Sequence, residues 1–218
     1  MTKSHLLAVI GFCLLLAGCG TSDRRGVAVS QEKQSNQGGK AANRDDLSSL
    51  MPKGELVEHP TYRQWKAFPV GTTVTQKTTT DSELTPGMTV TVLVTSLKQK
   101  TDDFLVLESQ STTTYADGRV NEHKPVESKI PRMIRLPEGM SAENWGKPKG
   151  TLAEEEIEAA GKKYRARKTQ SKGTTDAGDL FQTVWSSDEM PGGLVKSVSK
   201  VPAVKETTII EITEVKMP

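Results

Sequence analysis

The residues whose types and order most clearly indicate a chemical reaction lie near the start of the sequence, in the run Leu16-Ala17-Gly18-Cys19. Lys3 and the apolar run from Leu6 to Leu16 come before the cysteine, which is the order of a secretory signal. The apolar run is well short of the roughly 20 residues that span a hydrocarbon core, so cleavage is expected rather than a permanent spanning helix. An ordinary cleavage site needs small residues but no thiol, and the cysteine therefore indicates a further reaction at this position.

The segment resembles the signal of bacterial lipoproteins, in which small residues before a cysteine form a lipobox. The resemblance implies that Cys19 receives a diacylglyceryl thioether, that the chain is cut between Gly18 and Cys19, and that the new amino terminus is acylated. Two or three acyl chains hold a protein on a membrane where one does not. We therefore expect a signal peptide over residues 1–18 and a protein anchored by lipid in the cell envelope, facing the periplasm or the exterior. The choice between inner and outer membrane stays open.

Charge and cysteine content exclude several classes of function. The signal contains one base, Lys3, and no acid, so its removal changes 29 basic residues to 28 against 27 acidic ones. This balance predicts no nucleic-acid partner, which would require a clear basic excess on one face. Cys13 leaves with the signal and Cys19 carries lipid, so the mature domain would have no free thiol. Disulfides, thiolate catalysis and cysteine metal sites are then excluded.

The chain after the cysteine divides into a polar segment and a folded domain. Residues 19–59 are dominated by Gly, Ser, Gln, Asn, Lys and Asp, and no aromatic residue occurs between Phe12 and Tyr62. This composition predicts a disordered tether that holds the domain about 35 Å from the bilayer on average. Residues 60–218 are enough for one domain with its own core.

The predicted domain begins with a short helical turn. Tyr62, Trp65 and Phe68 are spaced by three residues, as one face of a helix requires, and Pro69-Val70-Gly71 then ends the pattern. Trp65 is expected to close one end of the core, in preference to stacking on a ligand.

The middle of the chain predicts antiparallel strands. Thr72–Thr75, Met88–Thr95 and Phe104–Gln110 alternate aliphatic and hydroxyl residues, which is typical of strands with one covered and one wet face. Turns are expected at Pro86-Gly87, at residues 98–103 and at residues 116–118, and an edge or entry strand at residues 129–136 because of Pro131. The predicted fold is all-β: a single antiparallel curved sheet or half-open barrel with meander connections.

Two segments allow alternative interpretations. Residues 151–168 have high helix propensity and a capping box, but Gly161 at their centre favours a hairpin with a turn at Ala160-Gly161. We predict the hairpin, relying on the family resemblance described below. Trp145, in the loop of residues 137–150, is expected to be pinned to the sheet rather than exposed for binding.

The last third predicts three strands and one defined turn. Leu180–Trp185, Leu194–Val198 and Lys205–Lys216 are the strands. Met190-Pro191-Gly192-Gly193 has proline and glycine at the two central positions of a type II turn. In such a turn Gly192 must have a positive φ, whereas the fourth position, Gly193, tolerates most side chains.

The order of these pieces resembles a family of small bacterial envelope lipoproteins. The resemblance rests on Trp65-x-x-Phe68-x-x-Gly71, on the glutamate-rich segment Glu154–Tyr164, and on the signature Trp185-Ser186-x4-Pro191-Gly192-Gly193-x-Val195-Lys196. It implies a curved antiparallel sheet or half-open barrel, broadly similar to lipoprotein carriers of the LolA type, and most members have no assigned activity. Many relatives carry a cysteine where this chain has Ala166.

No arrangement of residues in the sequence indicates catalysis. His59 and His123 are 64 residues apart, and neither a His-x-x-x-His pair nor a Gly-x-Ser-x-Gly elbow occurs. Adjacent acidic residues on a strand, such as Glu154-Glu155-Glu156, point alternately to opposite faces and cannot converge on one ion. We therefore expect no enzyme activity, no metal and no cofactor.

Two functions come first for the domain, and an enzyme with a catalytic set assembled from distant residues comes third. The first is a non-catalytic binding or carrier module, whose concave face accepts an apolar ligand through Val90, Val92, Phe104 and Ile210. The second is a structural or interaction module with a fully packed sheet that contacts another envelope protein. An empty apolar cavity would favour the first function, and a filled core with an exposed apolar patch would favour the second.

Overall fold

The computed structural model describes residues 54–83, 85–143, 145 and 150–218, so Cys19, its lipobox and most of the predicted tether lie outside the described residues. The folded part begins earlier than the predicted boundary at Pro60. Strand β1 (Leu56–Glu58) pairs with β7 (Met133–Arg135), and the backbone N–H of Leu136 donates to the carbonyl of Glu55 at 2.9 Å. Composition could not indicate this strand, because its partner is far away in the chain.

Helix α1 (Pro60–Trp65) forms the predicted entry to the domain. His59 caps it, because the Nδ1 atom accepts a hydrogen bond from the backbone N–H of Thr61 at 3.1 Å, and burial lowers the pKa of the His59 imidazole. Tyr62, Trp65 and Phe68 are all buried, so the three-residue spacing did mark the inward face. The predicted role of Trp65 as a core residue is confirmed.

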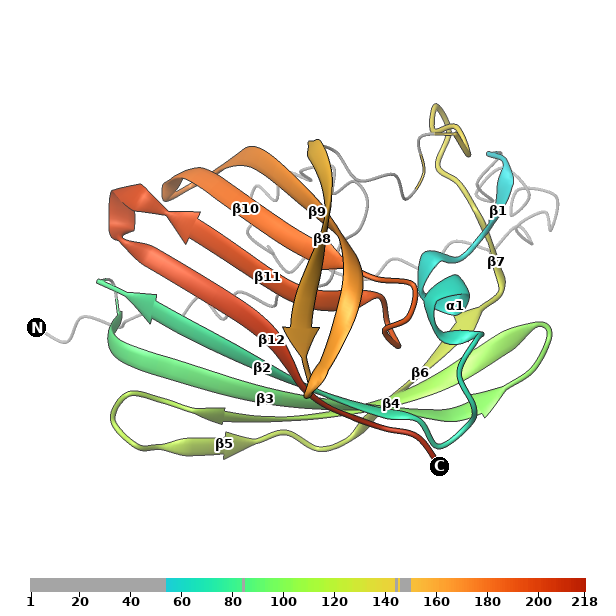
Figure 1. Ribbon diagram of the computed structural model, residues 1–218, viewed down its shortest axis with the longest axis horizontal. Coiled ribbons are helices and arrows are strands. Elements are labelled where there is room, and N and C mark those ends of the chain that lie inside the picture. Colours follow the sequence, from blue (N-terminus) through green and yellow to red (C-terminus); the bar gives the residue numbers. More distant parts are fainter. Residues whose placement is uncertain (1–53, 84, 144, 146–149) are drawn as a thin grey trace, which may run out of the picture.

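The rest of the domain is a ten-stranded antiparallel sheet with the order β5-β4-β3-β2-β12-β11-β10-β9-β8, in which β6 also pairs with β4 (Figure 1). Its strands are β2 (Thr73–Ser82), β3 (Thr85–Lys100), β4 (Phe104–Thr114), β5 (Val120–Glu122), β6 (Val126–Pro131), β8 (Thr151–Ala159), β9 (Lys162–Thr175), β10 (Gly178–Ser186), β11 (Leu194–Val201) and β12 (Glu206–Lys216). A 3-10 turn, η2 (Pro202–Val204), joins β11 to β12. The last strand pairs with β2, and the sheet is strongly curved without closing into a barrel. The predicted all-β curved sheet is confirmed.

The first hairpin turns earlier than predicted. Strand β2 ends at Ser82 and β3 begins at Thr85, so Pro86 and Gly87 lie inside β3 rather than in a turn. The register shifts between Thr80 and Ser82, and Gly87 has a φ of 97°. The proline and glycine, which usually mark a turn, therefore lie in an irregular stretch of the strand.

The predicted hairpin at residues 151–168 is confirmed, with Ala160 (φ 49°) and Gly161 (φ 71°) at the turn between β8 and β9. Diagonal ion pairs across the two strands support the pairing: Glu154 forms one with Arg165, and Glu156 forms one with Lys163 at 2.7 Å. The tip of the hairpin reaches the middle of the sheet, where the N–H of Ala160 donates to the carbonyl of Ile212 at 3.2 Å. Pairing with β9, together with the hydrogen bond from the hairpin tip to β12, thus overrides the helix propensity of the glutamate-rich segment.

The core lies at one end of the sheet, where α1 is found (Figure 1). Leu97, Leu105, Met190 and Val195 are completely buried there, and Trp65 belongs to the same cluster. Trp145 in the loop after β7 is half-buried, with its indole nitrogen shielded from solvent. No helix among the described residues is both long and apolar enough to cross a bilayer.

Candidate binding surfaces

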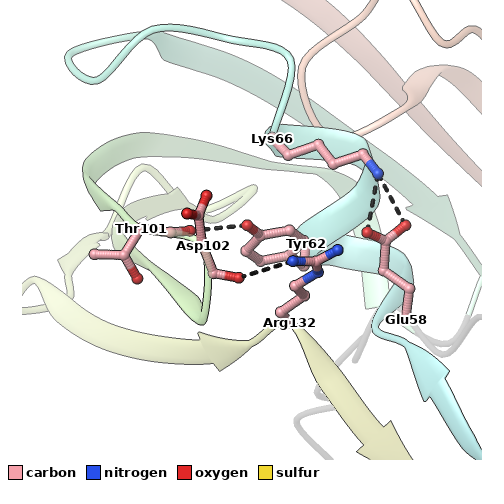
Figure 2. Close-up of polar contacts among 6 residues, drawn as sticks. All are labelled: Glu58, Tyr62, Lys66, Thr101, Asp102 and Arg132. Atoms are coloured by element: carbon pink, nitrogen blue, oxygen red, sulfur yellow. Dashed lines mark hydrogen bonds and ion pairs between the residues drawn. The ribbon is translucent and has the colours of Figure 1, made fainter.

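A polar cavity of about 430 Å³ lies where α1 meets the turn between β3 and β4. It is lined by Glu58, Tyr62, Lys66, Lys100, Thr101, Asp102 and Arg132. Figure 2 shows six of these residues, with Lys66 paired to the Glu58 carboxylate and with Tyr62 and Arg132 reaching the backbone carbonyls of Thr101 and Asp102. Three cations and two carboxylates line it, so its charge is nearly balanced.

Most polar groups of this cavity already have partners (Figure 2). The ammonium of Lys66 lies 2.9 Å from Oε1 of Glu58, and the hydroxyl of Tyr62 donates to the carbonyl of Thr101 at 2.8 Å. The ammonium of Lys100 donates to the carbonyls of Lys66 and Phe68, at 2.9 and 2.7 Å, where α1 ends. These contacts fix α1 to the β3–β4 turn, and they do not place a nucleophile beside a base.

A second cavity of about 300 Å³ lies at the tip of the β8–β9 hairpin, against β11 and β12. The ion pair between Lys196 and Glu211, at 2.7 Å, lies on its wall, and Ile212 and Val195 add apolar surface. Like the first cavity, it is an open depression with charged residues in its lining. Among the described residues no group of three His, Cys, Asp or Glu side chains could hold a metal ion.

Register defines the two faces of the sheet, because residues paired across antiparallel strands point to the same side. We call the side that carries Val74, Leu97 and Leu107 the core face, and the opposite side the outer face. Leu97 pairs with Leu107, and Val74 pairs with Thr95, which lies two residues from Leu97 on β3. All these residues therefore share one face.

The predicted apolar face does not exist as one surface. Val92 pairs with Lys77, which pairs with Glu211, so Val92 is on the face opposite to Ile210. Val90 lies two residues from Val92, and Phe104 alternates with the buried Leu105, which places both on the outer face. Only Ile210 is on the core face, where it is buried. The error came from assuming that valines point inward and threonines outward.

Hydroxyl side chains occupy the core face beyond the core. We call this set the hydroxyl-lined region; it comprises Gln76, Thr78 and Thr80 of β2, Thr89, Thr91, Leu93 and Thr95 of β3, Ser109, Ser111 and Thr113 of β4, Thr208 and Ile210 of β12, and Ser197 and Ser199 of β11. None of its members is ionisable. Its members come from five neighbouring strands of the sheet, β4, β3, β2, β12 and β11, whose order can be followed in Figure 1.

Hydrogen bonds within the hydroxyl-lined region link neighbouring strands. Thr91 and Thr113 are joined at 2.9 Å, and the hydroxyls of Thr80 and Thr208 at 3.2 Å. Thr95 and Ser109 form a third pair at 3.2 Å. Most of the region is half-buried, so the pairs are packed side by side and yet partly accessible.

The outer face of the same strands is charged instead. One row across β2, β12 and β11 is formed by Lys77, Glu211 and Lys196. The carboxylate of Glu108 on β4 forms an ion pair with the ammonium of Lys98 at 2.9 Å. Both faces of these strands therefore carry polar side chains, but ionisable ones occur on the outer face and not in the hydroxyl-lined region. The signal for this was present in the sequence, because Thr91, Leu93, Thr95 and Leu97 have the same parity along β3.

Trp185, from the proposed signature, is engaged with its neighbouring strands. Its indole Nε1 donates to Oε1 of Glu155, and the ammonium of Lys168 lies 5.3 Å from the ring centroid. The hydrogen bond from Trp185 is the main cause of a lowered pKa of the Glu155 carboxyl, with Lys168 contributing. The tryptophan thus ties β10 to β9 and β8.

The turn at residues 190–193 has the expected hydrogen bond, from the N–H of Gly193 to the carbonyl of Met190 at 2.8 Å, and Gly192 has a φ of 79°. Gly193 differs from the expectation, because its φ of 75° is also positive. The turn packs on α1: a Cβ on Gly192 would lie 3.3 Å from Trp65 Nε1. Pro191 and Gly193 are buried, so the turn is a structural part of the core end.

Comparison with known proteins finds little that resembles this chain. No protein-family profile matches it, and no curated protein matches it in sequence. Two crystal structures are similar, one of a protein described as exported with a YmcC-like fold from Bacteroides fragilis and one of a protein described as a lipoprotein from Parabacteroides distasonis. Each has 11% identity and a TM-score of 0.40, over 68% of this chain and 97% of the other. The resemblance to LolA-type carriers stays a prediction.

Proposed function

We propose that this chain is a lipid-anchored protein of the bacterial cell envelope whose folded domain is a non-catalytic binding module. The anchor rests on the lipobox Leu16-Ala17-Gly18-Cys19 and the short apolar run before it. In this proposal acyl chains on Cys19 hold the protein on a membrane, and the domain faces the periplasm or the exterior.

The observation that supports a binding module is the hydroxyl-lined region. A sheet face that continues from the core usually stays apolar, whereas this one becomes polar and uncharged beyond Leu97 and Val74. An apolar carrier would need an apolar lining, and the residues expected to supply it are divided between the two faces. The ligand of this module is therefore polar rather than an acyl chain.

The contacts of the two cavities support a function other than catalysis. In the cavity beside α1, Lys66 neutralises Glu58 and Lys100 is committed to backbone carbonyls. In the cavity at the hairpin tip, Lys196 and Glu211 neutralise each other. Each of these ionic groups stabilises a junction between elements.

One observation favours the second function, contact with another envelope protein. Met88 and Val120 lie on the outer face near Val90, with 56% and 59% of their surfaces exposed. A protein partner would cover such apolar side chains. This candidate places the binding surface on the outer face, opposite to the hydroxyl-lined region.

The anchor is tested by metabolic labelling with palmitate. Cys19→Ala should abolish labelling and release the protein from the membrane fraction. Cys13→Ala is the matched control, since Cys13 lies inside the signal, and it should be labelled like the natural protein. Labelling that survives Cys19→Ala would exclude the proposed anchor.

The binding module is tested by native mass spectrometry of the domain, purified from its own cells and freed of lipid. A bound polar compound supports the hydroxyl-lined region as the site. A bound acyl compound would support the original hypothesis of a carrier for an apolar ligand. A bound protein would support the hypothesis that the outer face contacts another envelope protein.

A further inference from the structure

We infer that the hydroxyl-lined region binds a neutral, hydroxyl-rich chain, such as a segment of an uncharged polysaccharide. The inference rests on the proposed binding function and names its ligand class. Four observations support it: the absence of charge within the region, the paired hydroxyls, one buried hydroxyl without a partner, and the repeat of the strands.

The first observation is the distribution of charge. The hydroxyl-lined region crosses β11, β12, β2, β3 and β4 without an ionisable side chain, although the outer face of these strands carries Lys77, Glu211 and Lys196. An anionic or cationic polymer would find no opposite charge among the members of the region and would lose hydration without compensation. A neutral polar ligand matches it.

The second observation is the chemistry of the hydroxyl pairs. In Thr91–Thr113 and Thr80–Thr208 either oxygen can be the donor, because a hydroxyl both donates and accepts. Each pair can therefore turn a proton or a lone pair toward a ligand without losing its own bond. Ligand hydroxyls have the same dual character, so many pairings are satisfied at once.

The third observation is Ser197 on β11, the strand at one end of the region. Only 3% of Ser197 is exposed, and its Oγ has no hydrogen-bond partner among the described residues. Ser197 pairs with Ile210, which pairs with Thr78, so register aims its side chain into the region. An unpaired buried hydroxyl is unfavourable, and a neighbouring hydroxyl that rotates when a ligand binds would satisfy it.

The fourth observation is the spacing across the strands. Ser199, Thr208, Thr80 and Thr89 form one row on four neighbouring strands, which repeat about every 4.8 Å. This repeat is comparable to the length of one pyranose unit, so a polysaccharide lying across the strands would meet a polar group at each unit. Leu93, which is half-buried, offers apolar atoms for the C–H faces of the sugar rings.

The test is an NMR titration of the mature chain, residues 19–218 with Cys19→Ser, isotopically labelled. The probes are neutral hexasaccharides of glucose, maltohexaose and cellohexaose, and the anionic control is oligogalacturonate of similar length. We expect saturable shifts confined to β2, β3, β11 and β12 with at least one neutral probe, and none with the anionic one.

Variants locate the site. Thr78→Val with Thr91→Val, and separately Ser197→Ala, should weaken binding of the neutral probe at least tenfold. The control Thr79→Val with Thr112→Val changes outer-face threonines on β2 and β4 and should leave binding unchanged. Urea unfolding of each variant shows whether its fold is retained, and Ser197→Ala removes no hydrogen bond, so it keeps the test valid if the double variant unfolds.

Three outcomes overturn the inference. They are saturation by the anionic probe alone, no shift with either neutral probe, and equal loss of binding in the outer-face control. A polar ligand found by native mass spectrometry, together with failure of both neutral probes, would leave the proposed binding function standing and reject only the ligand class.

Discussion

The indole Nε1 of Trp185 on β10 donates a hydrogen bond to Oε1 of Glu155 on β8, thirty residues away in the chain. Lys168 of β9 lies between them, with its ammonium 3.2 Å from Oε2 of Glu155. One residue from each of three strands therefore meets on one face at the edge of the sheet. The edge strand β8 is held by side chains as well as by its backbone pairing with β9.

This contact predicts a pH dependence at the edge of the sheet. The pKa of Glu155 is lowered in the folded protein, so its contribution to stability is present above the pKa of the unfolded chain and is lost as pH falls through the folded pKa. An NMR titration of the Glu155 carboxyl should give a midpoint below the ordinary glutamate value. In Trp185→Phe the midpoint should move up toward that value, and an unchanged midpoint would show that the indole does not act on this carboxyl.

The glycine turn predicts that two neighbouring positions are both sensitive. Gly192 and Gly193 have φ angles of 79° and 75°, which alanine adopts only at a cost of about 1 kcal/mol or more. Gly193→Ala would also bring a Cβ within 2.8 Å of Gln64 Nε2, so it should destabilise the domain at least as much as Gly192→Ala. Thermal melts decide this, with Gly173→Ala as the control, because that glycine has open space around its Cβ. A neutral Gly193→Ala would mean that the turn relaxes easily.

Thr72 predicts a stabilising substitution. It is completely buried, and its Oγ1 has no hydrogen-bond partner among the described residues. Thr72→Val keeps the shape of the side chain and removes the unsatisfied hydroxyl, so the free energy of unfolding should rise by about 1 kcal/mol. Thr95→Val should give no such gain, because Thr95 is bonded to Ser109. Urea unfolding measures both, and a loss of stability in Thr72→Val would indicate an internal partner for the hydroxyl.

The position of β1 predicts where the folded domain begins. Val57 is buried, β1 pairs with β7, and Glu58 forms an ion pair with Lys66. A chain that starts at Pro60 should therefore be less stable than one that starts at Gly54, by about 2 kcal/mol from the burial of one valine. Urea unfolding of the two chains gives the difference. Equal stabilities would place the boundary at Pro60 after all.

Local sequence was sufficient for the elements whose partners are adjacent in the chain. The three-residue spacing of Tyr62, Trp65 and Phe68 identified α1 and its buried face, because a helix face depends only on near neighbours. Alternation identified the long strands, whereas the hairpin of β8 and β9 was predicted from Gly161 together with the family resemblance. The lipobox at Cys19 is likewise a purely local pattern, and only the sequence supports it.

Which face of each strand points inward was decided by the tertiary structure. Alternation shows that Val92 and Thr91 point to opposite sides, but it cannot show which side meets the core. The inward face is the one that carries Leu97 and Val74. These residues are buried because α1 and the C-terminal strands β11 and β12 belong to the same core. The pairing of β12 with β2 then put Ile210 on the same face as Thr78, which is opposite to the face of Val92. The hydroxyl-lined region exists only through these long-range pairings, because strands distant in sequence must be brought into register before their threonines share one surface.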